Sequence, residues 1–433
     1  MTTVISDYEL ISCLEQNDDF TLYRAFSTMK RQTVLMKVLT SPQPTAEDIS
    51  SLVHDYRIAK QITSDGILRP LLLERHQHAP VIIYEPFEGV NLREHLKDRR
   101  LNMAAFLQIA IQLASTLDQI HQHHVIHKNI HPRNILIEEH TNRVKLMGFN
   151  IATRLSKESQ FDTSVYIMEG IPAYSSPEQT GRMNRALDKR TDLYSLGMTF
   201  YELLTGRLPF EADDPMEWVH AHIAKMPLPI ENIKANVPVT VSEIIMKLLD
   251  KAPENRYQSA FGLQKDLERC LLQWRRTGTV EPFTIAQYDN KGKFELPHQL
   301  YGRNEEKKAL LQAFDRISTG KKEVVLITGA AGIGKTALVG EVQKPLVREK
   351  GYFITAKFDQ LQRHVPYAPI IHAFRGLVRQ LLAEGDLRIA SWKQKILNAI
   401  APNGKVITDV LPELEWLIGK QPDVDPLSAV EAQ

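Results

Sequence analysis

The sequence predicts a two-lobed α+β domain followed by an α/β domain, and three observations support this prediction. Short β-branched runs gather before residue 90, amphipathic helical patterns dominate from about residue 92 to 274, and a glycine-rich loop lies between a predicted strand and a predicted helix near residue 330. The length of 433 residues gives room for several domains of about 150 residues each. We place the first domain at residues 8–275, a linker at 276–297 and the second domain at 298–433.

The strand-rich lobe is predicted from two apolar runs, VLMKVL at 34–39 and VIIYEPF at 81–87, which are bounded by polar or turn residues. The helical lobe is predicted from FLQIAIQLASTLDQIHQ at 106–122 and TDLYSLGMTFYELLTG at 191–206, where apolar residues recur at three- and four-residue spacing. Gly206 stands where a C-terminal helix cap belongs. Residues 277–297 carry Gly, Pro and polar residues without a sustained period, which is typical of a linker.

Composition excludes several classes of protein. Hydrophobic residues make up 43% and charged residues 24%, so the chain is not an extended disordered polymer. With 53 Lys and Arg against 52 Asp and Glu, the net charge of +1 gives no electrostatic reason to expect a nucleic acid or a membrane as partner. The two cysteines, Cys13 and Cys270, form neither a disulfide framework nor a Cys-rich zinc site. No apolar run approaches the roughly 18 residues of a membrane span, and the N-terminus lacks the pattern of a signal peptide, so we expect a cytoplasmic protein.

The apolar run KEVVLITG (322–329) predicts a strand at 324–328, and the glycine-rich loop that follows it fits the pattern G-x-x-x-x-G-K-[ST]. Its glycines let backbone N–H groups approach phosphate oxygens, the lysine reaches the β- and γ-phosphates, and the threonine hydroxyl ligates Mg²⁺. We therefore predict an ATP site with Mg²⁺ in the second domain, made by Gly329, Ala330, Ala331, Gly332, Ile333, Gly334, Lys335 and Thr336.

Hydrolysis of ATP at this loop requires a further acidic residue at the end of a second apolar strand. No four-residue apolar run followed by two acidic residues occurs after Thr336, and Asp359 fits the capped end of a core strand better. We expect ATP binding with little or no turnover. Only 97 residues follow Thr336, so we also expect this ATPase domain to be incomplete.

Three stretches of the first domain together resemble a protein kinase. HKNIHPRNIL (127–136) is similar to the catalytic loop H-R-D-L-K-x-x-N, GIPAYSSPE (170–178) to the segment that ends in A-P-E, and DLYSLG (192–197) to the helix that anchors the catalytic loop. The resemblance implies that Lys37 is the phosphate-binding lysine and therefore a nucleotide-binding residue, with Asp55 in place of the usual helix-C glutamate as its possible partner. It also implies that Arg256 pairs with Glu178.

The residues that carry kinase chemistry differ from this pattern. The chain has no glycine before Gly66, so residues 11–22 cannot form a Gly-rich lid over phosphates. The position of the catalytic aspartate holds Asn129, whose amide cannot accept a proton, and the D-F-G position begins with Gly148, which has no carboxylate for Mg²⁺. Asn134 is then the one usual metal ligand left.

Two more positions change with them. His131 replaces the loop lysine, and Ile171 replaces the threonine after Gly170. Loss of a general base alone costs about 10²–10⁴-fold in rate. The pattern favours a pseudokinase.

The stretches 175–210, 300–314 and 357–382 further resemble a family of large bacterial signalling proteins. These join a serine/threonine-kinase-like domain, an AAA/STAND-type ATPase, a GAF domain and a sensor histidine kinase. The resemblance implies signalling proteins or downstream histidine-kinase modules as partners, and a chain that represents the N-terminal part of such an architecture.

We interpret the chain as a protein-kinase-like domain that has lost phosphoryl transfer, followed by part of a P-loop ATP-binding domain. An active divergent serine/threonine kinase is the first alternative. An interaction scaffold that binds no nucleotide is the second.

Overall fold

The computed structural model describes residues 4–5, 7–76, 79–97, 99–154, 170–180, 187–289, 303–318, 322–330, 333, 335–340, 352, 354, 356, 367–382 and 386–422.

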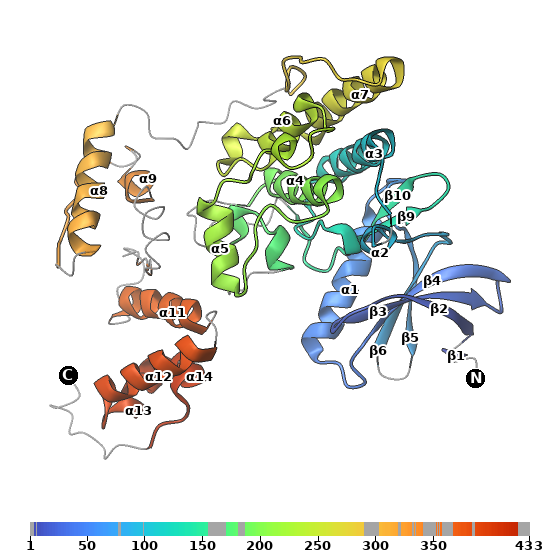
Figure 1. Ribbon diagram of the computed structural model, residues 1–433. Helices are drawn as coiled ribbons and strands as arrows, with labels where there is room; N and C mark the ends of the chain where they lie inside the picture. Colours follow the sequence, from blue (N-terminus) through green and yellow to red (C-terminus); the bar gives the residue numbers. More distant parts are fainter. Residues whose placement is uncertain are drawn as a thin grey trace.

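The first lobe is an antiparallel sheet with one long helix, as the strand-rich sequence predicts (Figure 1). The strands follow the order β1-β2-β3-β4-β6-β5, and each hydrogen-bonded pair is antiparallel. Their bounds are β1 Val4–Ile5, β2 Tyr8–Gln16, β3 Phe20–Ser27, β4 Gln32–Leu39, β5 Pro70–His76 and β6 Ala79–Tyr84. Helix α1, Ala46–Gln61, begins at a capping box in which Thr45 and Asp48 exchange hydrogen bonds. It packs on β5 and β6 and brings Asp55 against the sheet.

The connection to the second lobe runs through β7 (Val90–Asn91) and the short helix α2 (Leu92–His95). Helix α3, Met103–Gln122, follows, and its apolar face is buried as the 106–122 periodicity predicts. A loop region follows, and it meets the first lobe at the cleft between the two lobes, where the Phe149 N–H donates to Asp55. Its elements are β8 Val125–Ile126, η1 Pro132–Asn134, β9 Ile135–Glu138, β10 Arg143–Leu146 and β11 Thr153–Arg154.

The remainder of the second lobe is helical and encloses the main core. Its elements are η2 Pro172–Tyr174, η3 Pro177–Thr180, α4 Arg190–Thr205, α5 Pro215–Ala224, η4 Ile230–Asn232, α6 Val239–Leu248, η5 Pro253–Asn255 and α7 Ala260–Thr277. Helix α4 is buried on nearly every side, and it ends at Gly206 with a φ of 78°, which confirms the predicted cap. The core joins apolar residues of α3, α4, α6 and α7 into one cluster.

The start of the predicted linker packs against this lobe. Phe283, Ile285 and Ala286 lie against the core, and the guanidinium of Arg269 stacks on the Phe283 ring at 4.1 Å. The carboxylate of Asp289 accepts hydrogen bonds from the backbone at 258–259. Residues 278–289 are therefore attached to the helical lobe, and the proposed domain bounds remain predictions.

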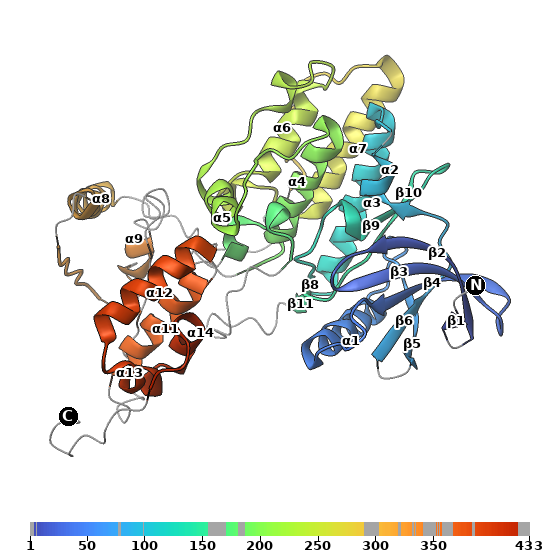
Figure 2. The same cartoon turned by 60° about the horizontal axis from the view of Figure 1, so that its bottom comes forward.

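The regular elements described in the second part of the chain are helices. Helices α11 (Ala368–Leu382), α12 (Asp386–Ile400), α13 (Gly404–Val410) and α14 (Glu415–Ile418), with η6 (Pro412–Leu414), bury a small apolar cluster and appear together in both views (Figures 1 and 2). Along the sequence, helix α8 (Asn304–Ser318) precedes residues 322–330 and helix α9 (Lys335–Gly340) follows them.

The strand predicted at 324–328 is not formed in this structure. Residues 322–330 carry no strand assignment, and the side chains of Val324 and Leu326 are 96% and 86% exposed. A strand exists only when a second strand pairs with it, and no described segment pairs with residues 322–330. The apolar, β-branched pattern alone does not supply that partner. Within the described residues, no helix is long and apolar enough to cross a membrane.

Candidate functional site

The loop at 127–134 is held by the carboxylate of Asp192, at the start of α4. Its Oδ2 accepts the backbone N–H of His127 at 2.8 Å, and its Oδ1 accepts that of Lys128 at 2.7 Å. His121 Nε2 lies 2.9 Å from the same carboxylate, and Asp192 is fully buried. The anchoring role predicted for the helix at 191–206 is confirmed.

Asn129 lies in this loop where the resemblance expects a general base. Its backbone N–H donates to His127 Nδ1 at 3.2 Å, and its carbonyl accepts from Asn134 Nδ2 at 2.9 Å. Its side-chain Nδ2 donates to Asn150 Oδ1 at 3.3 Å, while its buried Oδ1 has no partner among the described residues. An amide in this position orients its neighbours but does not take a proton at neutral pH.

Gly148 leaves a space that Asn134 occupies. The φ of Gly148 is +88°, a left-handed conformation that favours glycine. A Cβ at this position would lie 2.5 Å from Asn134 Nδ2 and 2.7 Å from Asn134 Cγ. The side-chain amide of Asn134 therefore occupies the space that the Cβ of a metal-binding residue at position 148 would need.

The same contacts decide whether Mg²⁺ fits this cleft. Asn134, the predicted ligand, is already bonded to the carbonyl of Asn129. Among the described residues, no group of three or more His, Cys, Asp or Glu side chains could hold a metal ion. Mg²⁺ at a phosphate site is usually held by one or two carboxylates together with phosphate oxygens and water, and neither Asn129 nor Gly148 supplies a carboxylate, so Asn134 alone does not make this cleft a fitting Mg²⁺ site.

Lys37 of β4 is bound to Asp55 of α1. Its Nζ lies 2.6 Å from Asp55 Oδ2, and the two side chains are 3% and 1% exposed. The second oxygen, Oδ1, accepts the backbone N–H of Phe149 at 2.9 Å. Asp55 is thus the partner of Lys37, as proposed from the sequence, and it ties the sheet lobe to the segment that begins at Gly148. The role of Lys37 toward a nucleotide stays a prediction.

His131 is a buried, neutral replacement for the expected lysine. Burial lowers the pKa of His131 to about 3, and the nearby His127 lowers it further. Its ring lies 5.7 Å from the Tyr174 ring, and its Nδ1 has no hydrogen-bond partner among the described residues. Ile171, at the threonine position, has no side-chain hydrogen-bonding group and is partly exposed. Neither position can assist a transferring phosphoryl group as a cation or a hydroxyl would.

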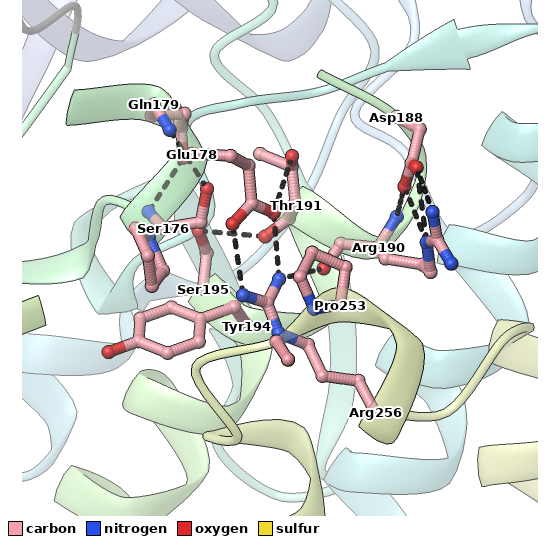
Figure 3. A network of polar contacts seen from close by, with 12 residues as sticks. Ser176, Glu178, Gln179, Asp188, Arg190, Thr191, Tyr194, Ser195, Pro253 and Arg256 are labelled. Carbon is pink, nitrogen blue, oxygen red and sulfur yellow. Dashed lines mark hydrogen bonds and ion pairs between the residues drawn. The ribbon is translucent and has the colours of Figure 1, made fainter. Parts of the chain in front are cut away.

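In the helical lobe, Arg256 and Glu178 form a buried bidentate pair (Figure 3). Arg256 Nη1 and Nη2 donate to the two carboxylate oxygens at 2.7 and 2.9 Å, and Thr191 Oγ1 donates to Glu178 at 3.0 Å. The remaining guanidinium N–H groups reach the carbonyls of Asp250, Arg190 and Lys251. This pairing, predicted from the sequence, is confirmed, and every charge in it is compensated.

Comparison with known proteins agrees with this arrangement. The family profile of the protein kinase domain matches residues 20–267, and that of the AAA ATPase domain matches residues 299–432. The chain belongs to the protein kinase family.

Relatives of the chain include signalling kinases of two kinds. The hybrid signal transduction histidine kinase G of Dictyostelium discoideum is 31% identical over 420 aligned residues, which cover 77% of this chain and 12% of that protein. A probable serine/threonine-protein kinase of Clostridium perfringens is 31% identical over 264 residues, covering 60% of this chain and 38% of the relative. The serine/threonine-protein kinase PknB of Mycolicibacterium smegmatis is 35% identical over 191 residues, covering 44% and 30%. The chain thus spans less than two fifths of each of these relatives.

The phosphate loop of the AAA ATPase domain is described in part. Lys335, at the start of α9, turns its Nζ back to the carbonyls of Gly329 and Ala330, both at 2.8 Å. Ile333 is partly exposed. Ala331, Gly332, Gly334 and the Thr336 side chain lie outside the described residues, as does Asp359. The ammonium of Lys335 thus contacts backbone oxygens of its own loop, and its role toward phosphate stays a prediction.

Four residues of the kinase cleft were missed by the sequence interpretation. Glu15 and Phe20 belong to the hairpin that replaces the Gly-rich lid, and Asn91 and Arg133 face them from the other side. The sequence held one signal for them: an acidic and an aromatic side chain stand in a lid segment without glycine.

Proposed function

We propose that this chain is an ATP-binding signalling protein whose kinase domain has lost phosphoryl transfer and whose AAA ATPase domain binds ATP with Mg²⁺. The single observation that carries the proposed loss of phosphoryl transfer is the geometry at Asn129 and Gly148. Neither position has a carboxylate, and the amide of Asn134 fills the space next to Gly148. Phosphoryl transfer depends on a positioned base and on metal-bound phosphates, so both requirements fail at one place.

The scaffold of the kinase domain is retained beside this loss. The Lys37–Asp55 pair, the Asp192 anchor and the Glu178–Arg256 pair are all formed. Such a domain keeps the shape of a kinase and is suited to docking other signalling proteins. The relationship to a hybrid signal transduction histidine kinase supports histidine-kinase modules as candidate partners. We propose a cytoplasmic location, without nucleic acid or membrane as partner, since the charge is balanced.

ATP binding is proposed for Lys335 and Thr336 together with the loop backbone. The supporting observations are the complete motif, its place in a segment that matches the AAA ATPase domain, and the contact of Lys335 Nζ with loop carbonyls. If Mg²⁺ binds, the Thr336 hydroxyl would hold it, and the ion would neutralise charge on the phosphates. We propose little or no hydrolysis.

The full chain, incubated with γ-labelled ATP, Mg²⁺ and generic acceptor proteins, tests the loss of transfer. Acceptor labelling should be equal in the wild type and in Lys37→Met. The variant Lys335→Ala, run in parallel, removes any contribution from the AAA ATPase domain. Labelling that disappears only in Lys37→Met would establish the alternative, an active divergent serine/threonine kinase.

Calorimetric titration of the wild type and Lys335→Ala with ATP tests the proposed ATP binding by the AAA ATPase domain. Wild type should bind ATP, and Lys335→Ala should lose that binding. Equal and negligible heats for both would favour the remaining alternative, an interaction scaffold that binds no nucleotide.

A further inference from the structure

The hairpin between β2 and β3 is a tight polar turn. The Oδ1 of Asn17 accepts the backbone N–H groups of Asp19 at 3.0 Å and Phe20 at 2.8 Å, and the Asn17 N–H donates to the carbonyl of Phe20 at 3.0 Å. These bonds occupy the backbone N–H groups of Asn17, Asp19 and Phe20, which are therefore not free to bind a ligand. The turn also sets the direction in which the Phe20 side chain leaves β3.

Phe20 covers the ammonium of Lys37. The Lys37 Nζ lies 4.0 Å from the centroid of the Phe20 ring, a distance at which a cation is attracted to the ring face. Lys37 is 2% exposed, and among the described residues its ion-pair partner is Asp55. The aromatic ring therefore covers one side of the Lys37 ammonium, which stands at the position of the phosphate-binding lysine of protein kinases.

An apolar cluster continues from Phe20 into the cleft between the lobes. Leu22 and Leu35 of the sheet and Leu136 and Met147 of the second lobe are each at most 1% exposed, buried by protein atoms alone. The ring of Phe20 packs against this cluster. Side chains from both lobes thus bury one another in the interior of the cleft.

Glu15, on β2, ties the hairpin to the second lobe. Its Oε2 accepts from Asn91 Nδ2 at 2.5 Å, and its Oε1 lies 3.4 Å from Arg133 Nη1. Asn91 is 3% exposed and is fixed by capping α2 through the N–H of Glu94 at 2.8 Å. Arg133 belongs to the loop that contains Asn129. The carboxylate therefore spans the opening of the cleft, from the sheet to α2 and the loop.

A second contact supports this closure. Arg24 Nη2 of β3 donates to the carbonyl of Gly89 at 3.0 Å, next to β7. Burial raises the pKa of the Glu15 carboxyl while Arg133 lowers it, which places Glu15 in a partly desolvated position between the lobes. The hairpin is consequently attached to the second lobe at two points.

We propose that Phe20 and Glu15 form a built-in plug that closes the kinase cleft and holds the two lobes together without nucleotide. Phe20 covers Lys37, and Glu15 bridges the opening to Asn91 and Arg133. ATP entering the cleft must displace both side chains, so its apparent affinity is reduced by the fraction of molecules that are open. The inference rests on the proposed function only in assuming that this domain does not need ATP for catalysis.

The plug is tested by measuring ATP affinity of the full chain in a Lys335→Ala background, which leaves the kinase cleft as the reporting site. Fluorescent ATP is titrated with and without Mg²⁺ into this background and into Glu15→Ala/Phe20→Ala on it. The plug predicts an affinity at least about tenfold higher in the double variant, equivalent to about 1.4 kcal/mol. The control is Glu9→Ala, an exposed acidic residue of the same strand, which should leave the affinity unchanged.

A second variant keeps the test decisive if the double variant does not fold. Arg133→Gln removes the ion pair from the opposite side and leaves the hairpin intact. It should raise ATP affinity several-fold and speed amide hydrogen exchange in β2 and β3. Unchanged affinity and exchange in correctly folded variants, or tight ATP binding in the background protein, would overturn the plug. Phosphoryl transfer by the wild type would instead overturn the proposed function.

Discussion

Substitution of Gly148 tests directly whether Asn134 has taken the place of the missing metal ligand. We expect Gly148→Asp to destabilise the kinase domain and to leave phosphoryl transfer absent, even when Asn129→Asp is added. A non-glycine residue in the left-handed region costs about 1–2 kcal/mol. The Cβ, 2.5 Å from Asn134 Nδ2, also forces the amide away from the carbonyl of Asn129, which loses a hydrogen bond of about 0.5–1.5 kcal/mol. The combined loss is roughly 1.5–3.5 kcal/mol.

The chain contains a matched control for the backbone part of this cost. Gly278 has a φ of +72°, and a Cβ there would meet nothing within 4 Å. Gly278→Ala therefore measures the conformational cost alone, whereas Gly148→Ala measures that cost together with displacement of Asn134. Urea unfolding followed by tryptophan fluorescence gives both free energies of unfolding. Equal losses for the two alanine variants would refute the claim that Asn134 holds the space, and labelled acceptor with Asn129→Asp/Gly148→Asp would refute the claim that the site cannot be restored.

Three further outcomes are expected. Arg256→Met should lower the free energy of unfolding by about 3–5 kcal/mol because it leaves Glu178 buried and unpaired. Adding Glu178→Leu should recover part of this loss. A loss below about 1 kcal/mol for Arg256→Met would contradict the importance of the pair. Burial lowers the pKa of Lys251 to about 7, whereas the ordinary lysine pKa is about 10.5. Between these two pH values the unfolded chain binds more protons than the folded chain. The free energy of unfolding of the wild type should therefore rise with pH over this window, by at most about 1.4 kcal/mol per pH unit. Urea unfolding at pH 7 and pH 9 should show this increase in stability for the wild type and a smaller increase for Lys251→Met. Equal increases in the two proteins would contradict the role of Lys251. ATP at about 100 times its dissociation constant should stabilise the AAA ATPase domain by about 2.7 kcal/mol, and Lys335→Ala should abolish the shift; a shift that survives this substitution would place ATP elsewhere.

Much of the fold follows from local patterns. The helices predicted near 106–122 and 191–206 and the strands predicted at 34–39 and 81–87 appear, the last ending at Tyr84. The first helix buries its apolar face as an amphipathic pattern predicts, whereas α4 is buried on nearly every side. Pairing between distant residues was predicted only where the kinase resemblance supplied the partner, as for Glu178 with Arg256. The strand expected at 324–328 shows the limit of such patterns, since pairing depends on a second segment rather than on the residues of the strand.

From the sequence alone it was determined that Asn129 and Gly148 carry no carboxylate and that residues 11–22 contain no glycine, since the absence of a chemical group does not depend on folding. Tertiary structure decided what fills the positions those groups would use. Asn134 comes against Gly148 because the loop and the strand end that carry them fold together, across 14 residues of sequence. Glu15 meets Asn91 and Arg133 across 76 and 118 residues. No local propensity encodes such encounters, because they arise only when two lobes close on one another and each buried polar group has to find a partner.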